Sequence, residues 1–251
     1  MQRISSMQNP QVQAWRRLKT RQARTEAGVF LVEGEKMVSE ALALPGRVTA
    51  LLVDEARQDR FAPLLTPDAF LVTEAILAAV TDTKTPQGIA AYVTLPDASP
   101  APGARLVALD GVQDPGNVGT ILRTADAAGF DGVLLSRECA DVFSPKCLRA
   151  TMGSIFRMPV TVCDSLPAAL LSLKEQGYNV LSSELGGSSF YDRPAPGEKY
   201  VLIIGNEGNG VSPQVSACAD ARLALPMYGG AESLNAAIAA GIMMYDLVNR
   251  G

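Results

Sequence analysis

The feature that most constrains the fold is a set of short strand-like runs that are apolar on both faces. Residues 105–110 read RLVALD and residues 201–205 read VLIIG, without the polar and apolar alternation of a half-exposed strand. Such strands need helices on both faces, as in a doubly wound parallel sheet. Ligands of these sheets bind at the carboxyl ends of the strands. The pattern predicts an α/β fold with its site at that edge.

A segment rich in proline and glycine, residues 96–104 (PDASPAPGA), predicts a linker between two domains. The second domain, residues 105–251, should contain the parallel sheet, with strands at 106–110, 132–135, 160–163, 180–183, 200–204 and 222–225. The first, residues 1–95, is predicted to be a smaller α/β domain. Its first helix should be capped by Asn9, run to about residue 27 and stop at Gly28. Its other elements are expected to be strands at 29–32, 48–53, 70–72 and 89–94 and helices at 35–44 and 74–80.

Composition excludes several classes of protein. The polar N-terminus lacks the apolar core of a signal peptide, and the longest apolar run, residues 236–245, ends at Asp246, too early for a membrane span. We therefore expect a cytoplasmic protein. The four cysteines form no CxxC pair, which favours buried reduced thiols and argues against a zinc site.

The net charge of −4 conceals an asymmetry that bears on nucleic-acid binding. Residues 1–25 hold six of the 22 basic residues and no acidic residue, so the other sixteen share the rest of the chain with all 26 acids. A basic run of this kind is either a solvated helix face or a contact for phosphates.

The first of three chemically suggestive segments, LDGVQDPGNVGTILRTADAAGF, covers residues 109–130. It predicts a strand, a turn and then a helix. Asn117 and Arg123 lie six residues apart, about 240° around a helix, so they converge only if Asn117 precedes the first turn. Otherwise Asn117 is a plain helix cap and Arg123 a solvated charge.

The second segment, LIIGNEGNGVS, spans residues 202–212. Its glycines Gly205, Gly208 and Gly210 let the backbone approach a ligand closely. Glu207 at the centre of the loop would repel a phosphate and favours a cation or a donor hydroxyl. A glycine-rich turn with an exposed glutamate is the alternative.

The third segment, LALPMYGGAESLNAAIAAGIMMYDLVNR, spans residues 223–250. Ser233 is predicted to cap the last helix, with Asn235 in its first turn. Small residues at 236, 237, 239, 240 and 241 allow this helix to pack closely on two sides.

Together these segments, with SPKCLRATMGSIFRMPV between them, closely resemble the SpoU (TrmH-like) RNA 2′-O-ribose methyltransferases of the SPOUT superfamily over residues 105–250. The family's first motif corresponds to Asn117, Gly119 and Arg123, its second to GNEGNG with Glu207, and its third to LPMYGGAESLN with Ser233 and Asn235. The resemblance implies a SPOUT domain with a parallel sheet and a deep trefoil knot.

The same resemblance implies a methyl transfer from S-adenosylmethionine to a ribose 2′-hydroxyl. The implied catalytic residues are Asn117, Arg123, Glu207, Ser233 and Asn235, with Arg123 activating the hydroxyl. The implied cofactor contacts are Gly205, Leu225, Met227 and Leu234. Family members are usually homodimers in which the arginine of the first motif comes from the partner subunit.

The N-terminal portion is similar to the ribosomal-protein-like substrate-binding domain that precedes the catalytic domain in many such enzymes. This makes the basic stretch a candidate RNA contact, with phosphates bound by Arg16, Arg17, Lys19 and Arg21. It favours ribosomal RNA, with transfer RNA as the alternative.

The chain contains no histidine, so imidazole is excluded as the general base. Three candidates for the general base remain: an arginine acting with an RNA phosphate, a carboxylate, or water. Because a guanidinium is a poor proton acceptor, Arg123 should act first as a positioning and electrostatic group.

Two other functions are the alternatives to methyl transfer. A nucleotide-dependent oxidoreductase would need GxGxxG after the first strand and an acidic ribose ligand about twenty residues on, and both are missing. A non-catalytic RNA-binding protein would not need the five candidate catalytic residues together.

Overall fold

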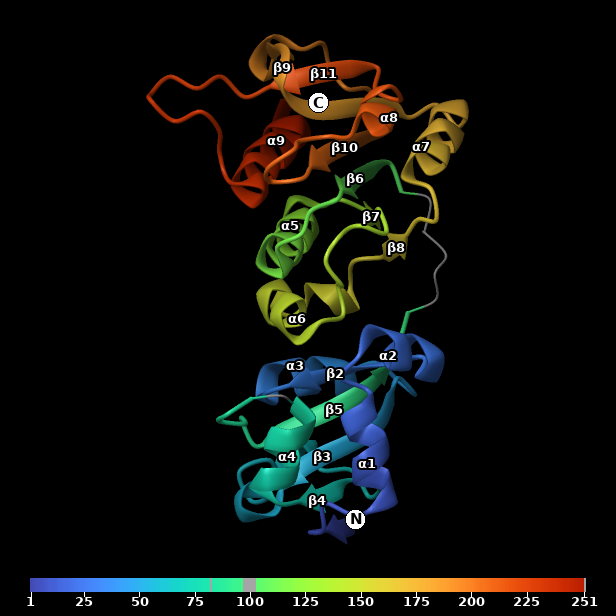
Figure 1. Cartoon of the computed structure of the whole chain (residues 1–251), viewed down its shortest axis with the longest axis vertical. Helices are drawn as coiled ribbons and strands as arrows, with labels where there is room; N and C mark the ends of the chain where they lie inside the picture. The colour runs from blue at the N-terminus through green and yellow to red at the C-terminus, as the bar shows by residue number, and fades with distance from the viewer. Residues whose placement is uncertain (82, 97–102, 251) are drawn as a thin grey trace. The chain divides into compact units, whose positions relative to one another are not determined.

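A computed structural model describes residues 1–81, 83–96 and 103–250, and the chain divides into two compact units (Figure 1). The first unit is Met1–Pro96 with Phe143–Leu148, and the second is Asp97–Val142 with Arg149–Gly251. Residues 97–102 of the predicted linker lie outside the described residues.

The first unit is built on a five-stranded mixed sheet. In spatial order its strands are β1 (Gln2–Ile4), β4 (Phe70–Val72), β3 (Val48–Asp54), β5 (Ile89–Thr94) and β2 (Val29–Glu33). Strands β1, β4 and β3 run parallel, whereas β5 is antiparallel to both of its neighbours. Four strands match the prediction closely, but β1 was not predicted because three residues carry no periodic signal.

Helices α1 (Pro10–Arg17), α2 (Arg21–Ala27), α3 (Glu35–Leu42) and α4 (Glu74–Thr81) accompany this sheet, with short 3₁₀ turns at Glu55–Arg57 and Ala62–Leu64. Trp15 of α1 lies in the core, edge-on to Phe70 and stacked on Tyr92. The Tyr92 hydroxyl donates to the Trp15 carbonyl over 3.1 Å, which satisfies a buried polar group and ties α1 to β5.

The prediction of one helix over residues 10–27 is wrong, because the chain forms α1 and α2 with a break between them. Thr20 caps α2 by accepting a hydrogen bond from the amide of Ala23. The buried guanidinium of Arg24 donates to the carbonyls of Leu18 and Lys19 in the break. These side-chain bonds replace the lost helical ones, which periodicity cannot reveal. The predicted cap at Asn9 and stop at Gly28 are confirmed.

The second unit has a six-stranded, wholly parallel sheet, as predicted. Its order is β11 (Ala221–Ala224), β9 (Asn179–Ser189), β10 (Tyr200–Gly205), β6 (Arg105–Asp110), β7 (Gly132–Leu135) and β8 (Val160–Val162). The connecting helices are α5 (Pro115–Ala128), α7 (Leu166–Glu175), α8 (Pro213–Ser216) and α9 (Ala236–Arg250), with 3₁₀ turns at Ser154–Phe156 and Phe190–Asp192. Helix α6 (Pro145–Thr151) also lies between strands of this sheet, but its first four residues, 145–148, belong to the first unit.

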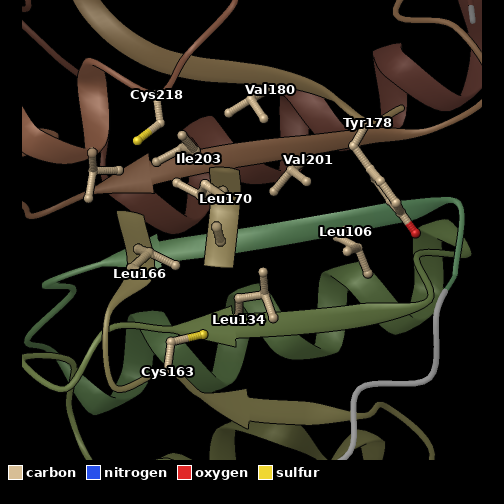
Figure 2. Packing of buried hydrophobic residues seen from close by; sticks show 12 residues of the cluster. Leu106, Leu134, Cys163, Leu166, Leu170, Tyr178, Val180, Val201, Ile203 and Cys218 are labelled. Atoms are coloured by element: carbon tan, nitrogen blue, oxygen red, sulfur yellow. The ribbon is translucent and has the colours of Figure 1, made fainter. Parts of the chain in front are cut away.

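Helices cover both faces of this sheet, which explains its continuous apolar strands. On one face Leu106, Leu134 and Ile203 pack against Leu166 and Leu170 of α7 (Figure 2). Successive side chains alternate, so Val107 and Leu202 point to the other face, and both are fully buried. Helices α5 and α9 pack together, and a Cβ on Gly241 would lie 3.6 Å from the Thr124 methyl.

All four cysteines are buried and none forms a disulfide. Within the described residues, no helix is long and apolar enough to cross a membrane.

Candidate active site

The first motif lies in the loop after β6 and at the start of α5, at the carboxyl edge of the second sheet. Asp114 caps α5, since its Oδ1 accepts the Asn117 amide over 3.0 Å, and Pro115 begins the helix. Asn117 is therefore the third residue of α5, so the condition for its convergence with Arg123 is not met, and the cap is Asp114 rather than Asn117. An Asp-Pro pair is itself a strong signal for a helix start, and it was available in the sequence.

The loop after β10 forms a compact turn around Asn206. Its Oδ1 accepts the amides of Gly208 and Asn209, each over 2.9 Å, and its Nδ2 donates to the Gly111 carbonyl over 2.7 Å. The end of the turn lies so close to its start that a Cβ on Gly205 would lie 2.3 Å from the Gly210 carbonyl carbon. Gly205 is therefore required by packing within the loop.

The third motif ends at the start of α9, and its cap differs from the prediction. Oδ1 of Asn235 accepts the amides of Ala237 and Ile238 at 2.9 and 3.2 Å. Helix α9 begins at Ala236, so Asn235 is the cap and Ser233 lies in the preceding loop. Both residue types are good caps, and only the position of the first helical turn decides between them.

A directed chain of hydrogen bonds joins the three motifs. Because Asn235 accepts with Oδ1, its Nδ2 donates, and it does so to Oδ1 of Asn117 over 2.9 Å. Asn117 in turn donates its Nδ2 to Oε1 of Glu207 over 2.9 Å. The orientation of each amide thus follows from its neighbour, and ultimately from the helix cap.

The Glu207 carboxylate is the terminal acceptor of this chain. Oε2 accepts a hydrogen bond from the backbone N–H of Gln113 over 3.1 Å, and Oε1 also accepts one from the backbone N–H of Asp114 over 3.2 Å. Partial burial raises the pKa of Glu207, but hydrogen bonds from Asn117 and the two amides outweigh it and leave the pKa below its usual value. Glu207 is therefore ionised at neutral pH and organises the site.

A cavity of about 690 Å³ opens beside these residues, at the carboxyl ends of β10 and β11 and along the middle of β9. Glu207 and Asn235 line it, and so does Ser233. All four residues expected to contact a cofactor also line it, namely Gly205, Leu225, Met227 and Leu234. Its volume suits a ligand of the size of S-adenosylmethionine.

The cavity wall favours a cationic ligand. It carries the carboxylates of Glu184, Glu207 and Glu232 and no lysine or arginine among its described lining residues. Glu184 accepts the Ser182 hydroxyl over 2.7 Å. A sulfonium and an ammonium group fit such a wall, whereas a dinucleotide's phosphates would be repelled. Neither glutamate was predicted as a site residue: Glu184 lies outside the three motifs, and Glu232 lies within the third motif beside Ser233.

Arg123 does not join this group of residues. Its side chain is exposed on α5, six residues beyond Asn117, and no contact places it at the cavity. Within this chain the geometry keeps the two first-motif residues apart.

The basic segment of the first unit presents the predicted side chains to solvent. Arg16, Arg17, Lys19 and Arg21 are all exposed, whereas Arg24 is buried and holds the break between α1 and α2. The described residues contain no cluster of side chains able to hold a metal ion.

Comparison with protein-family models gives two matches. The model of the SpoU rRNA Methylase family matches residues 104–245, and that of the MRM3-like substrate binding domain matches residues 9–91.

Known proteins resemble the chain over nearly its whole length. The 23S rRNA (guanosine(2553)-2′-O)-methyltransferase RlmP of Bacillus subtilis is 43% identical over 98% of this chain and 99% of its own. The AdoMet-bound rRNA methyltransferase from Sinorhizobium meliloti is 32% identical, with a TM-score of 0.86 over 99% of this chain and 98% of its own. The SpoU methyltransferase AviRb from Streptomyces viridochromogenes, solved with AdoMet, is 28% identical, with a TM-score of 0.86 over 97% and 98%.

Proposed function

The chain belongs to the SpoU rRNA methylase family, and from this we propose that it transfers a methyl group from S-adenosylmethionine to a ribose 2′-hydroxyl of ribosomal RNA. One observation supports the proposal above all. The hydrogen-bonded chain from Asn235 through Asn117 to Glu207 lies at the rim of a cavity whose wall suits a cation.

The residues present fit the cofactor. It would be held by Gly205, Leu225, Met227 and Leu234. The carboxylate of Glu232 would balance its positive charge, whereas Glu184 already pairs with Arg222 at 3.9 Å. When bound, S-adenosylmethionine supplies a methyl group on a positively charged sulfur, which leaves as a neutral thioether. The ribose oxygen forms the new bond to the methyl carbon, and its proton passes to an RNA phosphate beside Arg123 or to water.

Asn117 and Glu207 orient groups at the reaction site. Glu207 accepts three hydrogen bonds as an ionised group, so it is poorly suited to take the proton of the hydroxyl. The chain also has no histidine. We therefore assign Arg123 to positioning the hydroxyl, together with an RNA phosphate, and to stabilising the charge that develops on the oxygen.

Arg123 must reach the site from elsewhere, and a homodimer supplies the route. Ile238, Ile242 and Tyr245 form an exposed apolar stripe on α9, which packs beside α5. A two-fold contact through this stripe would bury apolar area. It would also let Arg123 of one subunit serve the cavity of the other.

We also propose that the C-terminus forms a trefoil knot. The chain passes β9 to form β11 and then returns to pack α9 against α5, which is the kind of path that a threaded C-terminus follows. The exposed basic side chains of α1 and α2 would bind RNA phosphates. A ribosomal RNA substrate would place the enzyme in the cytoplasm.

The testing experiment is transfer of labelled methyl from S-adenosylmethionine to total RNA from cells that lack this protein, followed by nuclease digestion. A labelled 2′-O-methyl nucleoside in ribosomal RNA is expected. Label in transfer RNA would change the substrate, and label on a base atom would refute ribose methylation. Absence of label, despite cofactor binding, would favour a non-catalytic RNA-binding protein.

A further inference from the structure

A second cavity of about 720 Å³ lies in the same unit, on the other side of the loop that begins at Asn206. It opens at the carboxyl ends of β6, β7, β8 and β10, and it shares Asn206, Asn209, Gly210 and Val211 with the cofactor cavity. The edge of a parallel sheet is a common site for ligands, and none of the roles assigned above uses this cavity.

The cavity wall has a rigid part and an unengaged part. Asn206 uses both ends of its amide within the loop, and Asp110 accepts the Ser212 amide over 2.7 Å. By contrast, the exposed side-chain amides of Gln113, Asn209 and Gln214 have no hydrogen-bond partner within the described structure. A fixed frame with unengaged amides is suited to recognising a ligand by hydrogen bonds.

The charges on the wall exclude a phosphate and favour a nucleobase. The carboxylates are those of Asp110, Glu138 and Asp164, and the guanidinium of Arg137 is ion-paired with Asp164. The wall is therefore net negative. Carboxylates accept hydrogen bonds from exocyclic amino groups, and side-chain amides pair with base edges. Unstacked RNA bases are read in this way.

The two cavities are joined through Glu207. Its carboxylate borders the cofactor cavity and accepts the backbone amide of Gln113, which lines the second cavity. A ribose placed near Glu207 and Asn117 can thus direct its base across Gln113 into the second cavity.

We infer that the second cavity binds the base of the nucleotide whose ribose is methylated, a base with an exocyclic amino group, through Gln113, Asn209, Gln214 and Glu138. This rests on the proposed methyl transfer and identifies where that reaction reads its target.

The inference is tested with the full-length protein and total RNA from cells lacking it. Asn209→Ala and Gln214→Ala should each raise the KM for RNA about tenfold, the value of one good base contact. Because Gln214 does not line the cofactor cavity, Gln214→Ala should also leave the Kd for S-adenosylmethionine unchanged. Gln176→Ala is the matched control, since the exposed side-chain amide of Gln176 donates to Ser172 and Gln176 is not among the described residues that line either cavity.

The variant Glu138→Gln distinguishes a cavity that binds a base from one that binds a phosphate. If the cavity holds an amino-bearing base, this variant raises the KM for RNA, and if it holds a phosphate, the KM falls because a repelling charge is gone. The inference is overturned if Asn209→Ala and Gln214→Ala have the same KM for RNA as Gln176→Ala. In that case, methyl transfer by the wild-type protein would still support the proposed function. Absence of wild-type transfer overturns both.

Discussion

The Nδ2 atom of Asn235 donates a hydrogen bond to Oδ1 of Asn117 over 2.9 Å, although the two residues are 118 positions apart. The first belongs to the cap of α9 and the second to the first turn of α5, so the start of one helix sets the orientation of a side chain on another. Asn117 in turn donates a second hydrogen bond to Glu207, which lies at the wall of the cofactor cavity. Several measurable consequences depend on this arrangement.

Asn235 has two functions that substitutions can separate. Asn235→Asp keeps an oxygen for the α9 cap but loses the donor to Asn117, so we expect near-normal stability and strongly reduced methyl transfer. Asn235→Ala should also lower the free energy of unfolding by about 1 kcal/mol, because the cap is lost. Thermal denaturation and labelled-methyl transfer measure the two effects. Wild-type turnover by Asn235→Asp would remove the bond to Asn117 from the mechanism.

The lowered pKa of Glu207 predicts a stability difference that depends on pH. A carboxyl whose folded-state pKa is depressed stabilises the fold above its unfolded pKa, about 4.3, and loses this effect as pH falls through the folded-state value. Wild type should therefore be more stable than Glu207→Gln at pH 7, and the difference should shrink below about pH 4.3. Denaturant titrations over this range test it, and a difference independent of pH would contradict it.

Arg123→Ala should abolish methyl transfer while leaving S-adenosylmethionine affinity largely intact, because Arg123 lies away from the cavity. If Arg123 acts across a dimer, mixing inactive Arg123→Ala and Asn117→Ala subunits should restore activity. At most about a quarter of the sites would be complete in a random mixture, since half of the dimers are mixed and each has one complete site. No recovery after verified subunit exchange would place both residues in one subunit's site.

Gly205→Ala should disrupt the loop after β10, because its Cβ would overlap the backbone of Gly210. We expect the affinity for S-adenosylmethionine, measured by calorimetry, to fall at least about tenfold. Gly229→Ala in the loop before α9 is the control, since nothing lies within 4 Å of its added Cβ. Equal affinities for the two variants would show that the loop relaxes without cost.

The basic side chains of the first unit should contribute to RNA affinity through phosphates. Replacing Arg16, Arg17 and Arg21 together by alanine should weaken RNA binding and reduce the slope of log K against log salt by about 2. Binding titrations at several salt concentrations measure the slope. An unchanged slope would mean that the RNA contact lies elsewhere.

All strands except β1, and the three motifs, could be predicted from the amino-acid sequence alone. The apolar runs at residues 106–110 and 200–204 predicted buried parallel strands, and β4 and β5 have the predicted boundaries. These predictions succeeded because a buried strand is recognisable from its own run of apolar residues. The resemblance of the three motifs to one family also came from sequence, and the family models and relatives confirm it.

Only the tertiary structure decided which of several suitable residues makes each contact. Asn235 rather than Ser233 caps α9, and Asp114 rather than Asn117 caps α5, because the position of the first turn depends on packing. The buried Arg24 divides the predicted first helix by bonding carbonyls that a continuous helix would use internally. The bond from Asn235 to Asn117 and the cavity beside Glu207 join segments far apart in the chain, and local sequence does not encode such distances.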